Sequence, residues 1–137
     1  MKMEPVTQLD RYGCGVACVA FVLGVSYQEA RKLFKEERIV SAKTYCFDIT
    51  RALLVKKVTY KYSKLTSGNL QLSQQKGAIV FVRKNKDIYP MGHYLVRTDN
   101  GWMDPWFNRE DSDDIGKAKA GYRKRLRDEA TWVIYPC

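Results

Sequence analysis

The first strong pattern in the chain is a nearly continuous apolar run over residues 14–23, which ends at Gly24. Glycine is common just beyond a helix C-terminus, so this run predicts a buried helix. Ser26 and Glu29 then form a capping box, in which both side chains satisfy free backbone donors at a helix N-terminus. Apolar residues at helical spacing follow, and they predict a second, amphipathic helix that runs to about Glu36.

A third helix is expected over residues 45–55, where Ile49, Ala52 and Leu53 recur at helical spacing. Beyond it the pattern changes to short β-branched and aromatic segments bounded by glycine and polar turn residues. These segments predict strands at residues 58–62, 78–82, 93–97, 102–104 and 131–135, and Asp99-Asn100-Gly101 predicts a hairpin. Helices followed by antiparallel strands indicate an α+β domain rather than a doubly wound parallel sheet.

The length and composition fit one globular domain that spans residues 1–137. A hydrophobic fraction of 45% is enough to fill a core, which excludes disordered and fibrous classes. The longest apolar run, residues 16–25, is too short to cross a bilayer, and the N-terminus lacks the apolar segment of a signal peptide. We therefore expect a cytoplasmic protein without membrane insertion.

The cysteines and the histidine narrow the possible chemistry. Four cysteines are spaced too irregularly for a disulfide framework or paired zinc-binding CxxC motifs, and we expect free thiols at Cys14, Cys18, Cys46 and Cys137. His93 is the only histidine, so any imidazole chemistry depends on it. The acidic stretch 110–114 lacks the spacing and the glycine of a calcium loop. We expect neither a metal nor a cofactor.

Cys14 lies between Gly13 and Gly15 at the predicted N-terminus of the first helix. Free backbone N–H groups and the helix dipole favour an anion there, which stabilises the thiolate, the form that attacks a carbonyl carbon. The flanking glycines leave room for a substrate backbone. The alternative is structural, because a free cysteine often packs as a small apolar residue.

Three further residues favour the functional interpretation. Gln8, six residues before Cys14, carries an amide that can donate to an oxyanion beside the Cys14 N–H. His93 follows a glycine at the start of an apolar strand. Asp104 comes in the next predicted strand, where a carboxylate can orient the imidazole.

The order Gln8, Cys14, His93, Asp104 resembles the papain-like cysteine peptidases, and most closely the peptidase C39 family, which processes bacteriocin leader peptides. The resemblance covers nearly the whole chain and implies a papain-like fold, with N-terminal helices packed on a small antiparallel sheet. It implies Cys14 as nucleophile, His93 as general base and then acid, Asp104 as the group that orients His93, and Gln8 as oxyanion-hole donor.

The resemblance also implies a substrate. Members of the family cleave a peptide or leader peptide after a Gly-Gly pair, and their peptidase domain commonly precedes a membrane transporter. This chain has no transmembrane segment of its own, so we expect either a solitary relative, for which a transporter would be a separate partner, or an excised domain. A solitary relative need not keep the Gly-Gly specificity.

The spacing of His93 and Asp104 departs from the family, which usually separates the two by a longer hairpin. With the Asn-Gly pair at the centre of the turn, Asp104 would lie roughly 14 Å along the strand from His93, too far for a hydrogen bond. A turn centred nearer residues 98–99, or a bulge, would bring the two side chains together. Asn108 is the alternative partner, opposite His93 in the first register.

Other features have alternative interpretations. Basic residues concentrate in 31–64 and 117–127 of a chain with net charge +9, and they could bind nucleic acid, form a solvated helix face or steer an acidic peptide. No base-reading fold is apparent, so nucleic acid is not the expected partner. A redox pair of Cys14 and Cys18 is disfavoured by their spacing in a helix. Trp106 could wall the active site beside Asp104.

The sequence therefore predicts a cysteine peptidase, a hydrolase that works through an acyl-enzyme. Transfer of the acyl group to an amine would use the same residues, so hydrolysis and acyl transfer both stay open. The rival is a catalytically silent relative that binds peptide through its basic surface. The presence of all four site residues argues against silence, because a binding module has no need of them.

Overall fold

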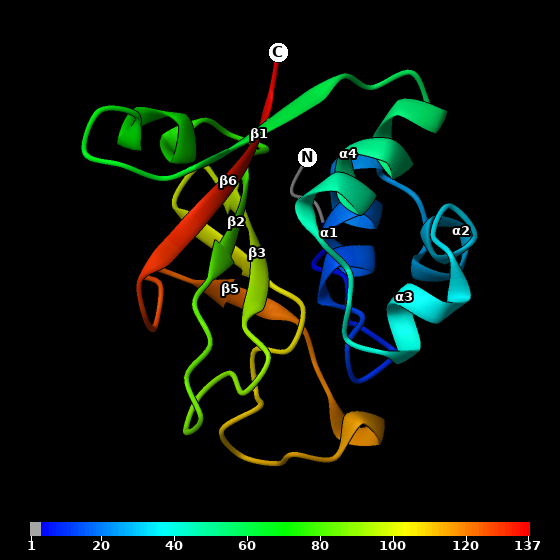
Figure 1. The fold of residues 1–137 in the computed structure, drawn as a ribbon. Helices are drawn as coiled ribbons and strands as arrows, with labels where there is room; N and C mark the ends of the chain where they lie inside the picture. The colour runs from blue at the N-terminus through cyan, green and yellow to red at the C-terminus, as the bar shows by residue number, and fades with distance from the viewer. Residues whose placement is uncertain (1–3) are drawn as a thin grey trace.

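A computed structural model describes residues 4–137 (Figure 1). The helices of this part of the chain come first: α1 (Cys14–Leu23), α2 (Tyr27–Arg31), α3 (Glu36–Val40) and α4 (Cys46–Val55). The strands follow: β1 (Tyr60–Lys64), β2 (Ile79–Val82), β3 (His93–Thr98), β4 (Gly101–Asp104), β5 (Gly121–Arg123) and β6 (Ala130–Pro136). Two short 3₁₀ helices, η1 (Leu70–Gln74) and η2 (Ile115–Lys117), lie in the connections. The expected α+β class is confirmed.

The strands form one antiparallel sheet in the order β1-β6-β2-β3-β4-β5. The four helices lie together beside one face of this sheet (Figure 1), and α1 packs against β3 at its centre. The central strands are buried on both faces. Tyr94 and Val96 belong to the core shared with the helices, whereas Val80 and Leu95 belong to a second core. The sheet therefore holds β3 rigidly between two apolar layers.

Helix α1 has the predicted bounds because its apolar residues are buried all round. Every residue from Gly15 to Phe21 is buried. Gly24 adopts φ +70°, and the N–H of Val25 donates to the Ala20 carbonyl at 3.1 Å, which closes the helix. Both ends of the helix are thus fixed by signals that lie in the local sequence.

The second predicted helix is wrong in its C-terminal half. Ser26 caps α2 as expected and accepts from the Glu29 N–H at 3.1 Å, but the helix ends at Arg31. The chain turns, and α3 begins at Glu36. Arg31 donates across this break to Glu36, with Nη2 2.9 Å from Oε1. Two short helices joined by an ion pair thus replace the continuous helix. Each of them contributes buried residues to the core.

Helix α4 and the strands follow the prediction, with a shift of two residues in β1, expected at 58–62 and found at 60–64. The hairpin turn differs from the Asn-Gly register. Thr98 pairs with Gly101, so Asp99 and Asn100 occupy the turn. A Cβ at Gly101 would lie 2.0 Å from the Arg123 carbonyl oxygen, so this glycine serves the approach of β5 rather than the turn.

Strand β5 was not predicted. The basic stretch 117–127 that contains it offered a solvated helix face as one interpretation, and that interpretation is wrong. Residues 115–117 form η2, and Gly121–Arg123 pairs with β4, with Trp102 opposite Arg123. The strand is only three residues long and carries no alternation of apolar and polar residues, so its sequence gives no local signal.

Candidate active site

Cys14 is the first residue of α1 and is partly exposed. Gly13 precedes it, and no side chain caps this end of the helix, so its first backbone N–H groups have no side-chain partner. Such groups, together with the helix dipole, favour a negative charge beside them. Gly15 packs closely, because a Cβ there would lie 3.0 Å from Thr44 Cγ2.

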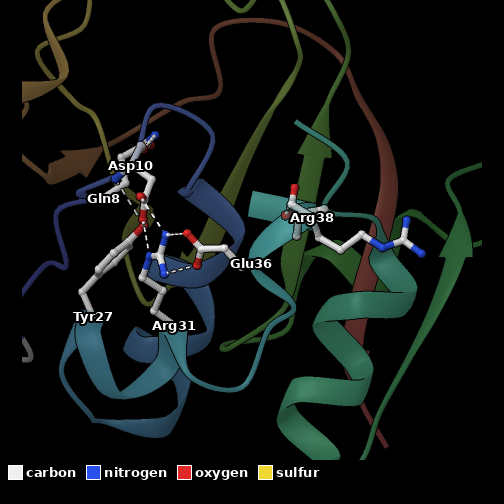
Figure 2. A network of polar contacts seen from close by, with 7 residues as sticks. Gln8, Asp10, Tyr27, Arg31, Glu36 and Arg38 are labelled. Atoms are coloured by element: carbon white, nitrogen blue, oxygen red, sulfur yellow. Dashed lines mark hydrogen bonds and ion pairs between the residues drawn. The ribbon is translucent and has the colours of Figure 1, made fainter. Parts of the chain in front are cut away.

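Polar contacts hold the loop that leads into Cys14 (Figure 2). Asp10 accepts a hydrogen bond from the Tyr27 hydroxyl at 2.5 Å and one from Arg31 Nε at 2.9 Å, both from α2. Burial raises the pKa of Asp10, but the hydrogen bonds from Arg31 and Tyr27 bring it below its usual value. A Cβ at Gly13 would lie 2.0 Å from the Tyr27 hydroxyl oxygen. The position of Cys14 therefore depends on this fit between the loop and α2.

His93 and Asp104 are in contact. His93 begins β3 and Asp104 ends β4, and they are only 2% and 0% exposed. His93 Nε2 lies 2.7 Å from Asp104 Oδ1. The register pairs Val96 with Met103, which puts Asp104 diagonally across from His93, and diagonal neighbours are within reach of each other's side chains. The turn at Asp99 and Asn100 is therefore what brings the two together.

The Asp104 carboxylate has three donors. Besides His93, the Trp106 backbone N–H donates to Oδ1 at 2.9 Å, and Arg123 Nε donates to Oδ2 at 2.6 Å. Arg123 also donates through Nη2 to the Phe107 carbonyl at 2.8 Å, and its side chain is 12% exposed. Asp104 is thereby fixed between a cation and the imidazole. The sequence did not identify Arg123, since it stood only as one cation in a basic stretch.

The electrostatics favour a charged pair. Burial lowers the pKa of His93, but the charge and hydrogen bond of Asp104, with those of Cys14, raise it to about 9. Burial raises the pKa of Asp104, but the charge and hydrogen bond of His93, with the bonds from Arg123 and the Trp106 backbone, lower it well below 3.8. At neutral pH an imidazolium therefore faces a carboxylate through Nε2. The other nitrogen, Nδ1, is the one available to Cys14.

Aromatic rings enclose this pair. Tyr89 stacks on His93, with centroids 4.6 Å apart and planes inclined by 19°, and it is 1% exposed. Trp106 is equally buried and its backbone contacts Asp104, but it does not line the cavity beside Cys14, so its role as a wall of the site stays a prediction. A ring stacked on the imidazole excludes water and fixes the direction of both nitrogens.

Gln8 is buried near Asp104, but its amide is occupied. Its backbone N–H donates to the Pro105 carbonyl at 3.2 Å. Its Nε2 donates to the carbonyl oxygens of Asp10 and Arg11, both at 3.0 Å, while Oε1 is buried without a hydrogen-bond partner. In this conformation Gln8 ties the loop before Cys14. Its role as oxyanion-hole donor stays a prediction. That role requires the Gln8 side-chain amide to give up one of these two hydrogen bonds.

Asn108, the alternative partner of His93, lies elsewhere. Its Nδ2 donates to the Lys117 carbonyl at 3.0 Å, and its Oδ1 accepts from the Lys119 N–H at 2.8 Å. Asn108 therefore braces the loop before β5. Of the two candidates, the structure brings Asp104 to the imidazole.

A cavity of about 230 Å³ opens beside Cys14 and His93. It adjoins a groove of about 490 Å³, and the two share Thr44, Met91 and Tyr94 among their lining residues. The groove continues along partly exposed aromatic side chains, with two lysines beside them: Tyr45, Phe47, Tyr62, Trp132, Lys43 and Lys84. Cys14 is thus accessible from an apolar groove with a basic border.

Cys18 lies one turn after Cys14 but is a core residue. All four cysteines are free thiols, as predicted, and Cys18 is fully buried in α1. Burial, reinforced by the charges of Cys14 and Asp104, raises the pKa of Cys18 well above its ordinary value. Cys18 is therefore a protonated core residue.

Among residues 4–137, no three His, Cys, Asp or Glu side chains are grouped so that they could hold a metal ion. No helix among these residues has the length and apolar character that crossing a membrane requires.

The chain was compared with known proteins. No family model matches it, and no curated protein matches it.

Proposed function

We propose that this chain is a cysteine peptidase of papain-like fold and mechanism. The observation that carries the proposal is the arrangement of three residues around one cavity. Cys14 is the partly exposed first residue of a buried helix, and it lines a cavity together with His93. Asp104 lies 2.7 Å from the far nitrogen of that histidine. A nucleophile, a base and an orienting carboxylate in this order are what acyl transfer requires.

The proposed reaction follows from these positions. The Cys14 thiolate attacks the peptide carbonyl carbon and forms a C–S bond, while the oxyanion lies near the first backbone N–H groups of α1. The His93 imidazolium gives its proton to the leaving amine as the C–N bond breaks. Water then attacks the thioester, and His93 takes a proton from it. Hydrolysis releases the acid and restores the thiolate and the imidazolium.

The substrate class in this proposal is a peptide or leader peptide. The cavity beside Cys14 is small, about 230 Å³, and it is bordered by the rings of Phe81 and Tyr94. A Gly-Gly pair before the cleaved bond needs no side-chain space there, which supports the specificity that the C39 resemblance implies. In this proposal the enzyme acts in the cytoplasm.

The test is the pH dependence of Cys14 alkylation, measured by peptide mass spectrometry in the native chain and in His93→Ala. A thiolate held by an imidazolium reacts well below pH ~8.5, the value of an ordinary thiol. We expect fast alkylation of Cys14 near neutral pH and its loss in His93→Ala. Cys137 is exposed and serves in the same digest as the reference thiol.

A matched control tests whether the loss of any carboxylate in this hairpin changes the alkylation of Cys14. Asp99→Asn removes one carboxylate from the same hairpin at a side chain that is 72% exposed, and it should leave the alkylation profile of Cys14 unchanged. Cleavage of Gly-Gly peptides by the native chain, and not by Cys14→Ala, completes the test. If there is no pH at which Cys14 reacts faster than Cys137, the proposal fails. The rival, a silent peptide-binding module, is then favoured.

A further inference from the structure

A cluster of two arginines and one aspartate borders the cavity of Cys14. Arg11, Arg109 and Asp113 all line it. Arg11 Nη1 lies 3.0 Å from Asp113 Oδ1, Arg11 Nη2 donates to the Asp113 carbonyl at 2.8 Å, and Arg109 Nη2 lies 3.3 Å from the same Oδ1. One carboxylate thus serves two guanidinium groups. The cluster keeps a formal charge of +1 beside the nucleophile.

The two guanidinium groups are held in place by an aromatic ring. Arg109 lies over the Trp106 ring at 4.8 Å from its centroid, and Arg11 lies at 5.9 Å from the same centroid. The Arg109 side chain is only 18% exposed, whereas Asp113 is 73% exposed. A guanidinium carries five N–H donors in a rigid fork. Arg109 uses one of them for Asp113 and lines the cavity, so it offers further preoriented donors at the cavity border.

The cluster borders the part of the cavity that the groove does not share. The groove shares Ala42, Thr44 and Met91 with the cavity, whereas none of the three cluster residues lines the groove. A peptide that fills the groove and passes Cys14 therefore meets the arginines within a residue or two of the cleaved bond.

We propose that Arg11 and Arg109 bind a carboxylate of the substrate next to the cleaved bond. The inference rests on the proposed function and adds a specificity to it. A carboxylate matches the site in two ways, because it is planar and accepts two parallel bonds from a guanidinium, and because its single charge balances the +1 of the cluster. A phosphate dianion would instead leave a net negative charge next to the thiolate.

The test compares two alkylating reagents of nearly equal size. Iodoacetate carries a carboxylate and iodoacetamide does not, and with each the Cys14 thiolate displaces iodide as the C–S bond forms. The ratio of their rates at Cys14 measures the attraction of the site for a carboxylate. One unit charge at about 8 Å and an effective dielectric constant of about 40 changes this ratio by roughly 5-fold.

Variants of opposite sign make the test sharp. Arg109→Gln should lower the iodoacetate to iodoacetamide ratio at Cys14 by roughly 5-fold, and Asp113→Asn should raise it by a similar factor. Arg125→Gln removes one exposed charge that does not line the cavity, and it should leave the ratio unchanged at physiological salt. The ratio at Cys137 in the same digests should be the same in all variants.

The outcomes separate this inference from the proposed function. If Cys14 is activated and depends on His93, but its ratio is the same in Arg109→Gln, Asp113→Asn and the native chain, the carboxylate site is wrong and the peptidase stands. If Cys14 behaves as an ordinary thiol while its ratio still follows these two variants, the carboxylate site stands as a binding site and the peptidase is wrong. An equal change in Arg125→Gln would show only the effect of net charge and would also overturn the inference.

The carboxylate could come from an acidic side chain or from the C-terminus of the substrate. Four versions of one Gly-Gly peptide distinguish the sources. The residue two positions after Gly-Gly is either Asp or Asn, and each of these two peptides is made with a C-terminal acid and with a C-terminal amide. Slower iodoacetamide alkylation of Cys14 with the Asp peptides assigns the site to a side chain. Protection that follows the terminal acid assigns it to the C-terminus. Equal rates with all four peptides would rule out a carboxylate preference.

Discussion

The pKa of His93 is the most direct quantity to measure, because this chain has a single histidine and its ring signals need no assignment among several. We expect the native chain to titrate with a pKa of about 9, against an ordinary value of 6.5. This difference corresponds to about 3 kcal/mol by which the folded chain favours the imidazolium. Burial opposes the charged form, so Asp104 and Cys14 supply more than this net figure.

The sign of the pH dependence follows from the raised pKa. The folded chain binds the proton more tightly than the unfolded chain, so this contribution to the free energy of unfolding is complete below pH 6.5. It falls as the pH rises and is lost at about pH 9. Asp104 has the opposite sign, since its pKa is lowered in the folded chain. Its contribution is complete above its ordinary pKa of 3.8 and is lost as the pH falls through its folded value.

Asp104→Asn tests the reasoning. Burial then remains, and Arg123 loses the carboxylate that its Nε contacts at 2.6 Å, so the pKa of His93 should fall below 6.5. The variant should also lose about 3–5 kcal/mol of unfolding free energy, because removing one partner of a buried pair leaves an uncompensated charge. The assay is NMR of the imidazole from pH 5 upward, with Asp99→Asn as the control. A native pKa near 6.5, or a pKa near 9 that survives in Asp104→Asn, would refute the reasoning.

Three further variants test the packing around the site by urea unfolding, followed through tryptophan fluorescence. Arg123→Met should cost about 3–5 kcal/mol, since the buried Asp104 carboxylate then keeps only one of its two cations, the His93 imidazolium; the exposed neighbour substitution Lys124→Met should cost almost nothing. Gly92→Ala should cost at least about 1–2 kcal/mol for its φ of +79°, and more because the new Cβ would lie 2.1 Å from the Phe81 ring. Gly13→Ala should cost about 1–3 kcal/mol because of overlap with the Tyr27 hydroxyl. Most of that cost should disappear in the Tyr27→Phe background, and additive costs would show that the hydroxyl is not the obstacle.

Features specified by neighbouring residues could be predicted from the sequence. The bounds of α1 follow from an apolar run and a glycine in the left-handed region, and the Ser26 cap follows from its own side chain. The end of α2 could not be predicted in this way. It depends on Arg31, whose guanidinium binds Asp10 and Glu36 at the same time, and Asp10 lies 21 residues earlier in the chain. A helix propensity carries no information about such a contact.

The candidate site divides in the same manner. Cys14, His93 and Asp104 could be named because each sits in a local context with a chemical meaning, a helix start or a strand end. Arg123 could not, because its role depends on a three-residue strand that pairs with β4. The Arg11 and Asp113 contact joins residues 102 positions apart, and nothing in either segment indicates the other. Supporting residues are therefore the part of a site that sequence reasoning finds last.

Gly101 shows how one residue type carries two meanings. An Asn-Gly pair between strands predicts a turn at that pair, and in that register Asp104 would lie too far along the sheet from His93. The glycine instead lets the Arg123 backbone approach β4, since any Cβ would lie 2.0 Å from its carbonyl oxygen. The turn moves back by one residue, which brings Asp104 within reach of the imidazole, and the same approach delivers the Arg123 side chain to the other carboxylate oxygen. The missing side chain at Gly101 thus permits the close pairing of β4 with β5, the strand whose Arg123 binds the carboxylate beside His93.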